Sequence, residues 1–349
     1  MAAFRINSQG ESLHYRVRGR GECVLLLHGL GSSGADWELQ IRALQRQFRL
    51  IVPDLPGSGH QTPASEKCSI PGFAATLWAL LDHLGVARVS VIGFSLGGAV
   101  ALEMALQRPD SVPRLVLINS LASYQIDHWC KWLEARIPPL LVGVFGMRRM
   151  ARLIAKRLFP KPCQEPLRRR AFSVVSAVPA RRYLAMASAL EAWSATDRLD
   201  RLKSKTLIIA AEHDYTPLEE KHALAAALHA EIVVVRGSRH GTPFDSIEAT
   251  NAALMALLSD RTLPPSDRWV CDKPEVLQRI AVTCGLAEQT GPSSLPEGQR
   301  SLRTFVSALM HFGSRSVDSQ QPRSGAQSAQ SRRVNPAKLL RDPLLDGFS

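Results

Sequence analysis

A serine flanked by glycines is the strongest chemical signal in the chain. Ser95 is the centre of residues 93–97 (GFSLG), which follow the apolar run 89–92 and lead into a helical pattern beginning at Leu96. A sharp turn from strand to helix exposes its central serine, and glycines on either side leave room for that turn. The positive end of the helix favours an attacking oxyanion. The pattern therefore predicts Ser95 as a nucleophile, the alternative being an ordinary glycine-rich turn.

A serine hydroxyl needs a general base and an acid that orients the base. His240 is the leading base because it lies in the polar loop 237–243, directly after a strand-like run. Asp214 follows the strand-like run 206–211 and can accept the imidazole Nδ1–H, although it can also be a helix N-cap before Pro217. Glu212 would face elsewhere, and Asn119, at the alternative acid position, is an amide. We therefore predict a Ser95, Asp214 and His240 triad.

A third segment can stabilise a developing oxyanion. Residues 28–31 (HGLG) follow the strand-like run 24–27, and glycine there lets the backbone approach a substrate closely. We predict that the backbone N–H groups of Leu30 and Leu96 form the oxyanion hole. A tight β-turn without this role is the alternative.

The elements that must position these residues alternate between strands and helices. Strand-like runs lie at 4–7, 13–17, 23–28, 49–54, 89–93, 114–119, 206–211 and 231–236. Helix-like runs lie at 70–84, 96–108, 217–229 and 247–259. Such alternation predicts a parallel sheet with helices on both faces.

A helical insertion interrupts this core. Between 121 and 203 no strand-like run of comparable quality is found, and four runs have helical spacing: 124–137, 147–159, 167–176 and 180–193. We predict an α/β core in two parts (1–120 and 204–260), a helical cap (121–203) and a C-terminal extension (261–349). The extension has helix-like runs at 274–288 and 299–312, and from about residue 313 its composition is that of a disordered segment.

These segments together resemble the α/β-hydrolase superfamily. They appear in the family's order: HGLG at 28–31, DLPGSG at 54–59, GFSLGG at 93–98, then Asp214 and His240. The resemblance covers about residues 4–260. It implies the α/β-hydrolase fold, with a mostly parallel eight-stranded sheet, helices on both faces and a helical cap after strand 6. In this family the Asp54 loop mostly shapes the site, so we assign Asp54 a structural role.

The nucleophile type discriminates between reactions within this family. Relatives that open epoxides or remove halides carry aspartate at the position of Ser95. A serine predicts acyl-enzyme chemistry and hydrolysis of a carboxylic ester, lactone or thioester without a metal or cofactor. C–C bond hydrolysis and acyl transfer on the same triad remain alternatives. A ligand-binding protein with little turnover, using its tail to contact a partner, is the alternative from another class.

The cap is expected to form the roof of the substrate pocket. Trp129, Trp132 and Phe145 offer an apolar lining, although they can equally pack the cap onto the core. Residues 121–200 hold 14 basic and 6 acidic side chains, much of the net charge of +12. This basic cap can attract an anionic or carrier-bound acyl substrate or make peripheral contact with an anionic membrane. A solvated surface without a specific partner is the simplest alternative.

Composition excludes several other classes of protein. The chain is 45% hydrophobic and 21% charged, as in ordinary globular proteins. No apolar run approaches the roughly 20 residues of a membrane span, and no apolar segment of a secretory signal follows Met1. The six cysteines are scattered, which predicts a cytoplasmic protein with reduced thiols. The basic residues lack interleaved aromatic residues, so we expect no nucleic-acid partner; the pattern leaves the oligomeric state open.

Overall fold

An eight-stranded sheet forms the centre of the protein. The computed structural model describes residues 2–5, 12–59, 68–125, 129–274 and 276. The strand order is β1-β2-β4-β3-β5-β6-β7-β8; β1 pairs with β2, and β2 with β4, in antiparallel fashion, and the other pairs are parallel. The strands are β1 (Ala2–Arg5), β2 (Ser12–Arg18), β3 (Glu22–Leu27), β4 (Phe48–Pro53), β5 (Ser90–Phe94), β6 (Arg114–Ile118), β7 (Lys205–Ala211) and β8 (Glu231–Val235). The predicted α/β-hydrolase fold with a mostly parallel sheet is confirmed.

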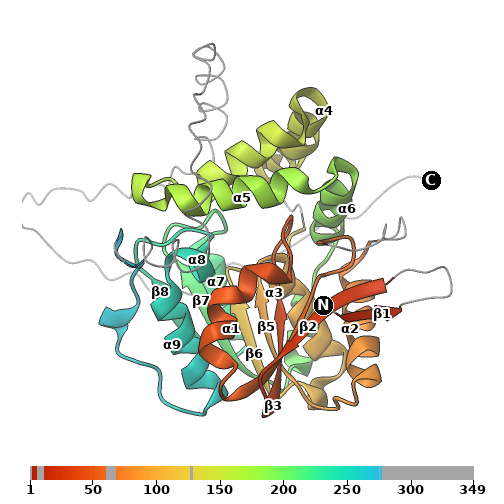
Figure 1. The fold of residues 1–349 in the computed structure, drawn as a ribbon, viewed down its shortest axis with the longest axis vertical. Coiled ribbons are helices and arrows are strands. Elements are labelled where there is room, and N and C mark those ends of the chain that lie inside the picture. The colour runs from red at the N-terminus through yellow and green to blue at the C-terminus, as the bar shows by residue number, and fades with distance from the viewer. Residues whose placement is uncertain (1, 6–11, 60–67, 126–128, 275, 277–349) are drawn as a thin grey trace, which may run out of the picture. The chain divides into compact units, whose positions relative to one another are not determined.

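Helices cover both faces of the sheet (Figure 1). One face packs against α1 (Glu38–Leu44) and α9 (Ile247–Leu258), and the other against α2 (Ile70–His83), α3 (Leu96–Gln107) and α7 (Leu218–Ala227). Strand β3 shows the reason, because successive side chains of a strand point to opposite faces. Val24 and Leu26 belong to the cluster with α1 and α9, and Leu25 and Leu27 to the other. Helix α1 had no counterpart among the sequence predictions.

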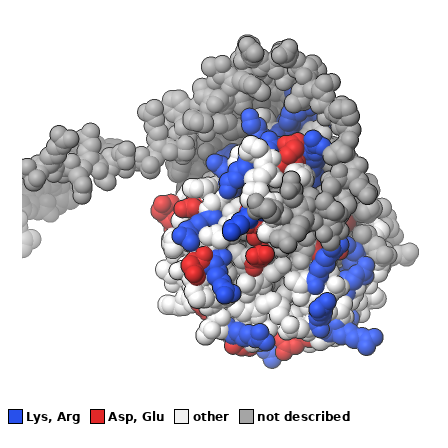
Figure 2. Space-filling model, turned by 60° about the vertical axis from the view of Figure 1, so that its left-hand side comes forward, with Lys and Arg blue, Asp and Glu red and all other residues white. Residues whose placement is uncertain are grey.

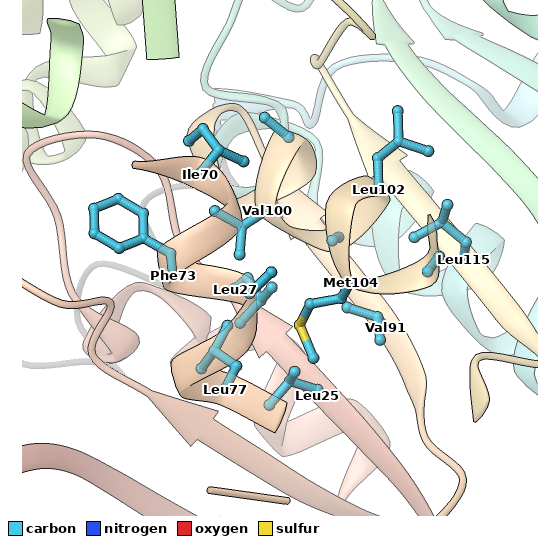
Figure 3. Close-up of a cluster of buried hydrophobic side chains, with 14 of the residues drawn as sticks. Leu25, Leu27, Ile70, Phe73, Leu77, Val91, Val100, Leu102, Met104 and Leu115 are labelled. Carbon is cyan, nitrogen blue, oxygen red and sulfur yellow. The ribbon is translucent and has the colours of Figure 1, made fainter. Parts of the chain in front are cut away.

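The helix that follows Ser95 is buried on all sides. Every residue of α3 except Gln107 is buried, and Val100, Leu102 and Met104 pack among side chains of β3, α2, β5 and β6 (Figure 3). A helix that is apolar all round belongs in a core, and its position is then fixed by packing. The N-terminus of α3 therefore holds Ser95 on a rigid element.

The helices between β6 and β7 lie together over the carboxyl ends of the parallel strands (Figure 1). They are α4 (Trp129–Leu158), α5 (Glu165–Ala177) and α6 (Ala180–Glu191). Helix α4 is broken at Gly146, whose φ of 75° no helix accommodates. The sequence predicted two separate helices, 124–137 and 147–159; the break at Gly146 indeed separates two helical segments, of which the second matches 147–159 and the first begins later and extends further than predicted. No helix among the described residues is long and apolar enough to cross a membrane.

An ion pair joins the end of this helical segment to α3, the helix that follows Ser95. Glu103 of α3 accepts two hydrogen bonds from Arg198 (3.2 and 2.9 Å) and one from Trp193 Nε1 (2.9 Å). Burial alone would raise the pKa of Glu103, but these donors outweigh burial and lower it. The chain leaving α6 is thereby attached to the element that carries Ser95.

Packing of the core continues past residue 260. Val270 forms a parallel bridge with Arg236 next to β8, and Trp269 is buried. The Asp272 carboxylate accepts from the Ile247 N–H at the start of α9 (2.6 Å). The predicted boundary at 260 therefore precedes the last residues that pack on the core. The helix-like runs at 274–288 and 299–312, and the segment from 313 onward, lie outside the described residues except for 274 and 276.

Candidate active site

Ser95 occupies a strained turn between β5 and α3. Its φ of 54° and ψ of −120° lie in a region that side-chain-bearing residues rarely adopt. The turn is possible because its neighbours lack side chains: a Cβ on Gly93 would clash with Gly97, and one on Gly97 with the backbone of Leu27 and His28. The predicted strand–turn–helix context of Ser95 is thus present.

Hydrogen bonds from β6 and the loop after it hold the backbone of this turn. The Ser95 N–H donates to Ile118 O (2.9 Å), and the Ser120 hydroxyl donates to Ser95 O (3.0 Å). Tyr124 lies behind Ser120, with 3.1 Å between their hydroxyl oxygens. Burial raises the pKa of Tyr124 to about 12, so its phenol stays neutral. These contacts give Tyr124 a supporting position behind the turn.

Asp214 and His240 come together at the carboxyl ends of β7 and β8. His240 Nδ1–H donates to Asp214 Oδ1 over 2.7 Å, and both side chains are buried. Asn119 at the end of β6 fixes this arrangement: its Nδ2 donates to His240 O (2.8 Å), and its Oδ1 accepts from Ala211 N–H (2.7 Å). The amide that was rejected as a triad acid thus connects the strand before Asp214 with the loop of His240.

A buried lysine contacts the other oxygen of Asp214. Lys221 Nζ donates to Asp214 Oδ2, and the two side chains are only 0% and 1% exposed. Thr216 Oγ1 donates to the same oxygen (2.6 Å), and the Tyr215 N–H donates to Oδ1 (2.7 Å). Burial alone would raise the pKa of Asp214, but His240 and Lys221 outweigh it and hold the pKa well below its usual range. Asp214 is therefore an anion at any working pH.

A tyrosine hydroxyl hydrogen-bonds to the second ring nitrogen of His240. The Tyr215 hydroxyl lies 2.7 Å from His240 Nε2, and its ring centroid is 4.0 Å from the imidazole centroid. Phe94 packs against the imidazole as well, at 5.2 Å between centroids. No hydrogen bond joins Ser95 directly to His240 within the described residues. Ser95 lies close enough to the Tyr215 hydroxyl to lower its pKa, although burial outweighs this effect.

The loop after β3 lies beside Ser95. A Cβ built on Gly29 would be 3.4 Å from the Ser95 Cβ, so only the missing side chain of Gly29 separates the loop from Ser95. His28 fixes the loop: its Nδ1–H donates to Gly29 O (2.9 Å), and its Nε2 accepts from Leu55 N–H (2.9 Å). Burial lowers the pKa of His28 and keeps it neutral. Leu30 follows Gly29 in this loop, and Leu96 is the first residue of α3; the role of their N–H groups as an oxyanion hole stays a prediction.

The cap contacts the core near the site through residues that the sequence analysis did not select. Phe159 packs on the His240 loop, because a Cβ on Gly241 would lie 2.6 Å from its ring. Tyr183 packs on Gly31, because a Cβ on Gly31 would lie 3.1 Å from its ring. The Arg157 guanidinium carbon lies 5.1 Å from the centroid of the Tyr215 ring. Phe145 instead has Arg149 over its ring at 5.2 Å.

Of the residues predicted to line the pocket, Phe145 alone has a described side chain. No contact between Phe145 and the triad is found among the described residues, so its role in substrate binding stays a prediction. Trp129 and Trp132 belong to α4, and their side chains lie outside what the structure describes.

Asp245 is a buried carboxyl group that supports the His240 loop. It accepts from Ser238 Oγ (2.7 Å), Ser246 Oγ (2.9 Å) and, from the cap, Gln164 Nε2 (3.1 Å). Burial raises its pKa to about 6 from an ordinary 3.8. A raised pKa in the folded state means that the stabilising contribution is complete below pH 3.8 and is lost as the pH rises through 6.

Asp245→Asn is expected to remove this pH dependence. The unfolding free energy of the wild type relative to the variant should fall by up to about 3 kcal/mol between pH 4 and pH 7.5. Urea unfolding of both proteins at these two pH values measures the difference. A constant difference would contradict the shifted pKa of Asp245.

Comparison with known proteins agrees with this fold. The family described as alpha/beta hydrolase fold matches residues 22–245, and the chain belongs to that family. A "Putative carbamate hydrolase RutD" from Caulobacter vibrioides is 28% identical over 262 residues, covering 71% of this chain and 96% of that protein. An esterase structure from Thermogutta terrifontis is 25% identical, with a TM-score of 0.67, covering 74% of this chain and 99% of that one.

Two further relatives differ in how much of their own length is matched. The "Magnesium-chelatase 30 kDa subunit" of Rhodobacter capsulatus is 44% identical over 137 residues, which cover 39% of this chain and 46% of that protein. The match therefore spans less than half the length of this curated relative. The structure of an enol-lactonase from Burkholderia xenovorans, 23% identical, has a TM-score of 0.67 and is covered over 100% of its length and 74% of this chain. At that identity it supports the fold.

The structure adds four polar residues to those that the sequence indicated: Asn119, Tyr124, Tyr215 and Lys221. Tyr215 directly follows Asp214, so its position next to a candidate acid was the available signal. Lys221 lies seven residues after Asp214 in a predicted helix, so helical spacing was the available signal. A lysine on an amphipathic helix usually faces water, and for that reason its burial could not be anticipated.

Proposed function

We propose that this protein is a serine hydrolase that cleaves a carboxylic ester, lactone or thioester through an acyl-enzyme intermediate. The observation that carries the proposal is the buried Asp214–His240 hydrogen bond next to a serine in a strained turn. An aspartate that accepts Nδ1–H selects the tautomer whose Nε2 is a base, and it stabilises the imidazolium that forms.

The reaction follows from these roles. Ser95 Oγ attacks the acyl carbon, and its proton passes to His240 Nε2. The backbone N–H groups of Leu30 and Leu96 stabilise the oxyanion. The C–O or C–S bond then breaks as His240 returns the proton to the leaving group. Water repeats the sequence on the acyl-enzyme, which releases the acid and restores Ser95.

The relatives agree with acyl chemistry in general terms. One similar structure is an esterase, and one similar protein is named as a carbamate hydrolase; both names imply attack on a carbonyl carbon. C–C bond hydrolysis and acyl transfer use the same triad. They differ in the group that receives the proton or the acyl chain, so product analysis separates them.

The charge of the cap supports an anionic or carrier-bound acyl substrate. Arg148 and Arg152 stack over Phe172, and Arg149 over Phe145; no carboxylate within the described residues lies within 4 Å of these three guanidinium groups. Basic side chains are also prominent on the face in Figure 2. Unpaired guanidinium groups attract carboxylate or phosphate groups over a Debye length of about 8–10 Å.

The proposal is tested by covalent labelling with a fluorophosphonate, which reacts with activated serines. We expect labelling of the wild type and none of Ser95→Ala or His240→Ala, with parallel loss of p-nitrophenyl ester hydrolysis. Labelling that persists in Ser95→Ala would place the reactive residue elsewhere. A wild type that is neither labelled nor active would favour the ligand-binding protein instead.

A further inference from the structure

Tyr215 contacts the base of the triad, although the reaction above gives it no role. Its hydroxyl lies 2.7 Å from His240 Nε2, and Ser95 is near enough to influence the pKa of that hydroxyl. The ring is tilted against the imidazole, with 4.0 Å between centroids and 31° between planes. A phenol in this place occupies the nitrogen that Ser95 needs as its base.

The hydrogen bonds of His240 determine what the phenol does there. Asp214 accepts only, so His240 Nδ1 carries the proton and Nε2 offers one lone pair. The Tyr215 O–H must then donate to that lone pair. Burial of the hydroxyl raises the pKa of Tyr215 well above its usual value, so the phenol keeps its proton. Ser95 cannot donate to the same lone pair at the same time.

The surroundings of Tyr215 allow its side chain to move. Its backbone is fixed by the N–H bond to Asp214 Oδ1 (2.7 Å), whereas the residue as a whole is 49% exposed. Rotation about χ1 can therefore turn the ring toward solvent without moving the loop. The Arg157 guanidinium, exposed on the cap, is 5.1 Å from the ring centroid and favours the inward position.

We propose that Tyr215 is a gate on the base of the triad, whose hydroxyl occupies His240 Nε2 until a bound substrate displaces it. The proposal rests on the proposed function, since it concerns access of Ser95 to its base. Once the ring has turned away, Nε2 is free to take the Ser95 proton. Arg157 of the cap stabilises the inward position of the ring, in which the hydroxyl bonds to Nε2. Contacts between a substrate and the cap can therefore change how readily the ring turns outward.

Tyr215→Phe tests the gate, because it removes the hydroxyl and keeps the ring and its stacking. One hydrogen bond changes a population roughly 2- to 13-fold. The second-order rate constant for fluorophosphonate labelling is therefore expected to rise by about that factor. Arg157→Gln, which leaves the hydroxyl in place, should give a smaller rise. Tyr15→Phe makes the same chemical change in β2, away from the site, and should leave the rate unchanged.

The direction of the change decides the outcome. A labelling rate in Tyr215→Phe equal to the wild type overturns the gate. A fall of 100-fold or more also overturns it, and would mean that the hydroxyl passes the proton from Ser95 to His240. Tyr215→Leu also lacks the hydroxyl and must likewise be labelled faster than the wild type. Labelling of the wild type that is independent of Ser95 contradicts the proposed function itself, a result that none of the Tyr215 outcomes produces.

Discussion

Asp214→Asn is expected to lower kcat for ester hydrolysis by about 10⁴-fold. The amide can present its NH₂ group to His240 Nδ1, which then stays unprotonated, and the proton moves to Nε2. A protonated Nε2 cannot accept from Ser95. Lys221 reinforces the effect, because its ammonium group needs an acceptor at the second position and so turns the amide nitrogen toward His240. Steady-state kinetics with a p-nitrophenyl ester measures the loss.

The control for this variant is the same change at Asp197, whose side chain is 84% exposed. Asp197→Asn should keep the activity of the wild type. Circular dichroism and urea unfolding show whether Asp214→Asn still folds. A folded Asp214→Asn variant that loses less than tenfold in kcat would contradict the role of Asp214 as the acid of the triad.

Lys221→Met is expected to lower the unfolding free energy by about 3–5 kcal/mol. The methionine fills most of the volume, but it leaves Asp214 as a buried anion with Thr216 as the remaining donor to Oδ2. Removal of one partner of a buried ion pair is costly because the other charge stays desolvated. Urea unfolding at pH 7.5 measures the loss. Lys203→Met, at a side chain that is 62% exposed, is the matched control and should change stability little.

A double variant shows whether charge is the cause. The double variant Lys221→Met, Asp214→Asn leaves no isolated charge. Its loss of unfolding free energy should therefore be smaller than the sum of the losses in the two single variants. Strict additivity would contradict a direct interaction between the side chains. Because the pKa of Asp214 is lowered in the folded state, its contribution is present above the ordinary value of 3.8 and is lost only as the pH falls below it. Between pH 6 and 8 the effect of Lys221→Met should therefore be constant with respect to Asp214.

Local patterns were sufficient to predict most of the core elements. Strands β5 and β7 read as short apolar runs because both of their faces are buried, and α3 follows directly from the glycine turn. Helix α1 was missed because only seven residues form it and three of them are buried, which is too short for a periodic signal. Helix α1 packs against α9, and the two are more than 200 residues apart in the sequence. Only the folded sheet brings them together.

The predicted cap lining shows where sequence information stops. Large apolar residues at helical spacing identify a buried face, but they do not say which neighbour buries it. In the structure, Phe159 and Tyr183 pack on the loops around the site, whereas Phe145 lies under Arg149. The choice depends on the crossing of α4 over the core and on the break at Gly146.

The sequence by itself predicted the residues of the candidate site and their order along the chain. Ser95, Asp214 and His240 follow strand-like runs of a parallel sheet, and the carboxyl ends of parallel strands meet at one edge. Only the tertiary structure decided what surrounds them: the buried Lys221 on Asp214, Asn119 under His240, and the Tyr215 hydroxyl on Nε2. The physical reason is that hydrogen bonds between side chains depend on distances of a few tenths of an ångström between separate elements. Packing sets those distances, and no local pattern in the sequence encodes them.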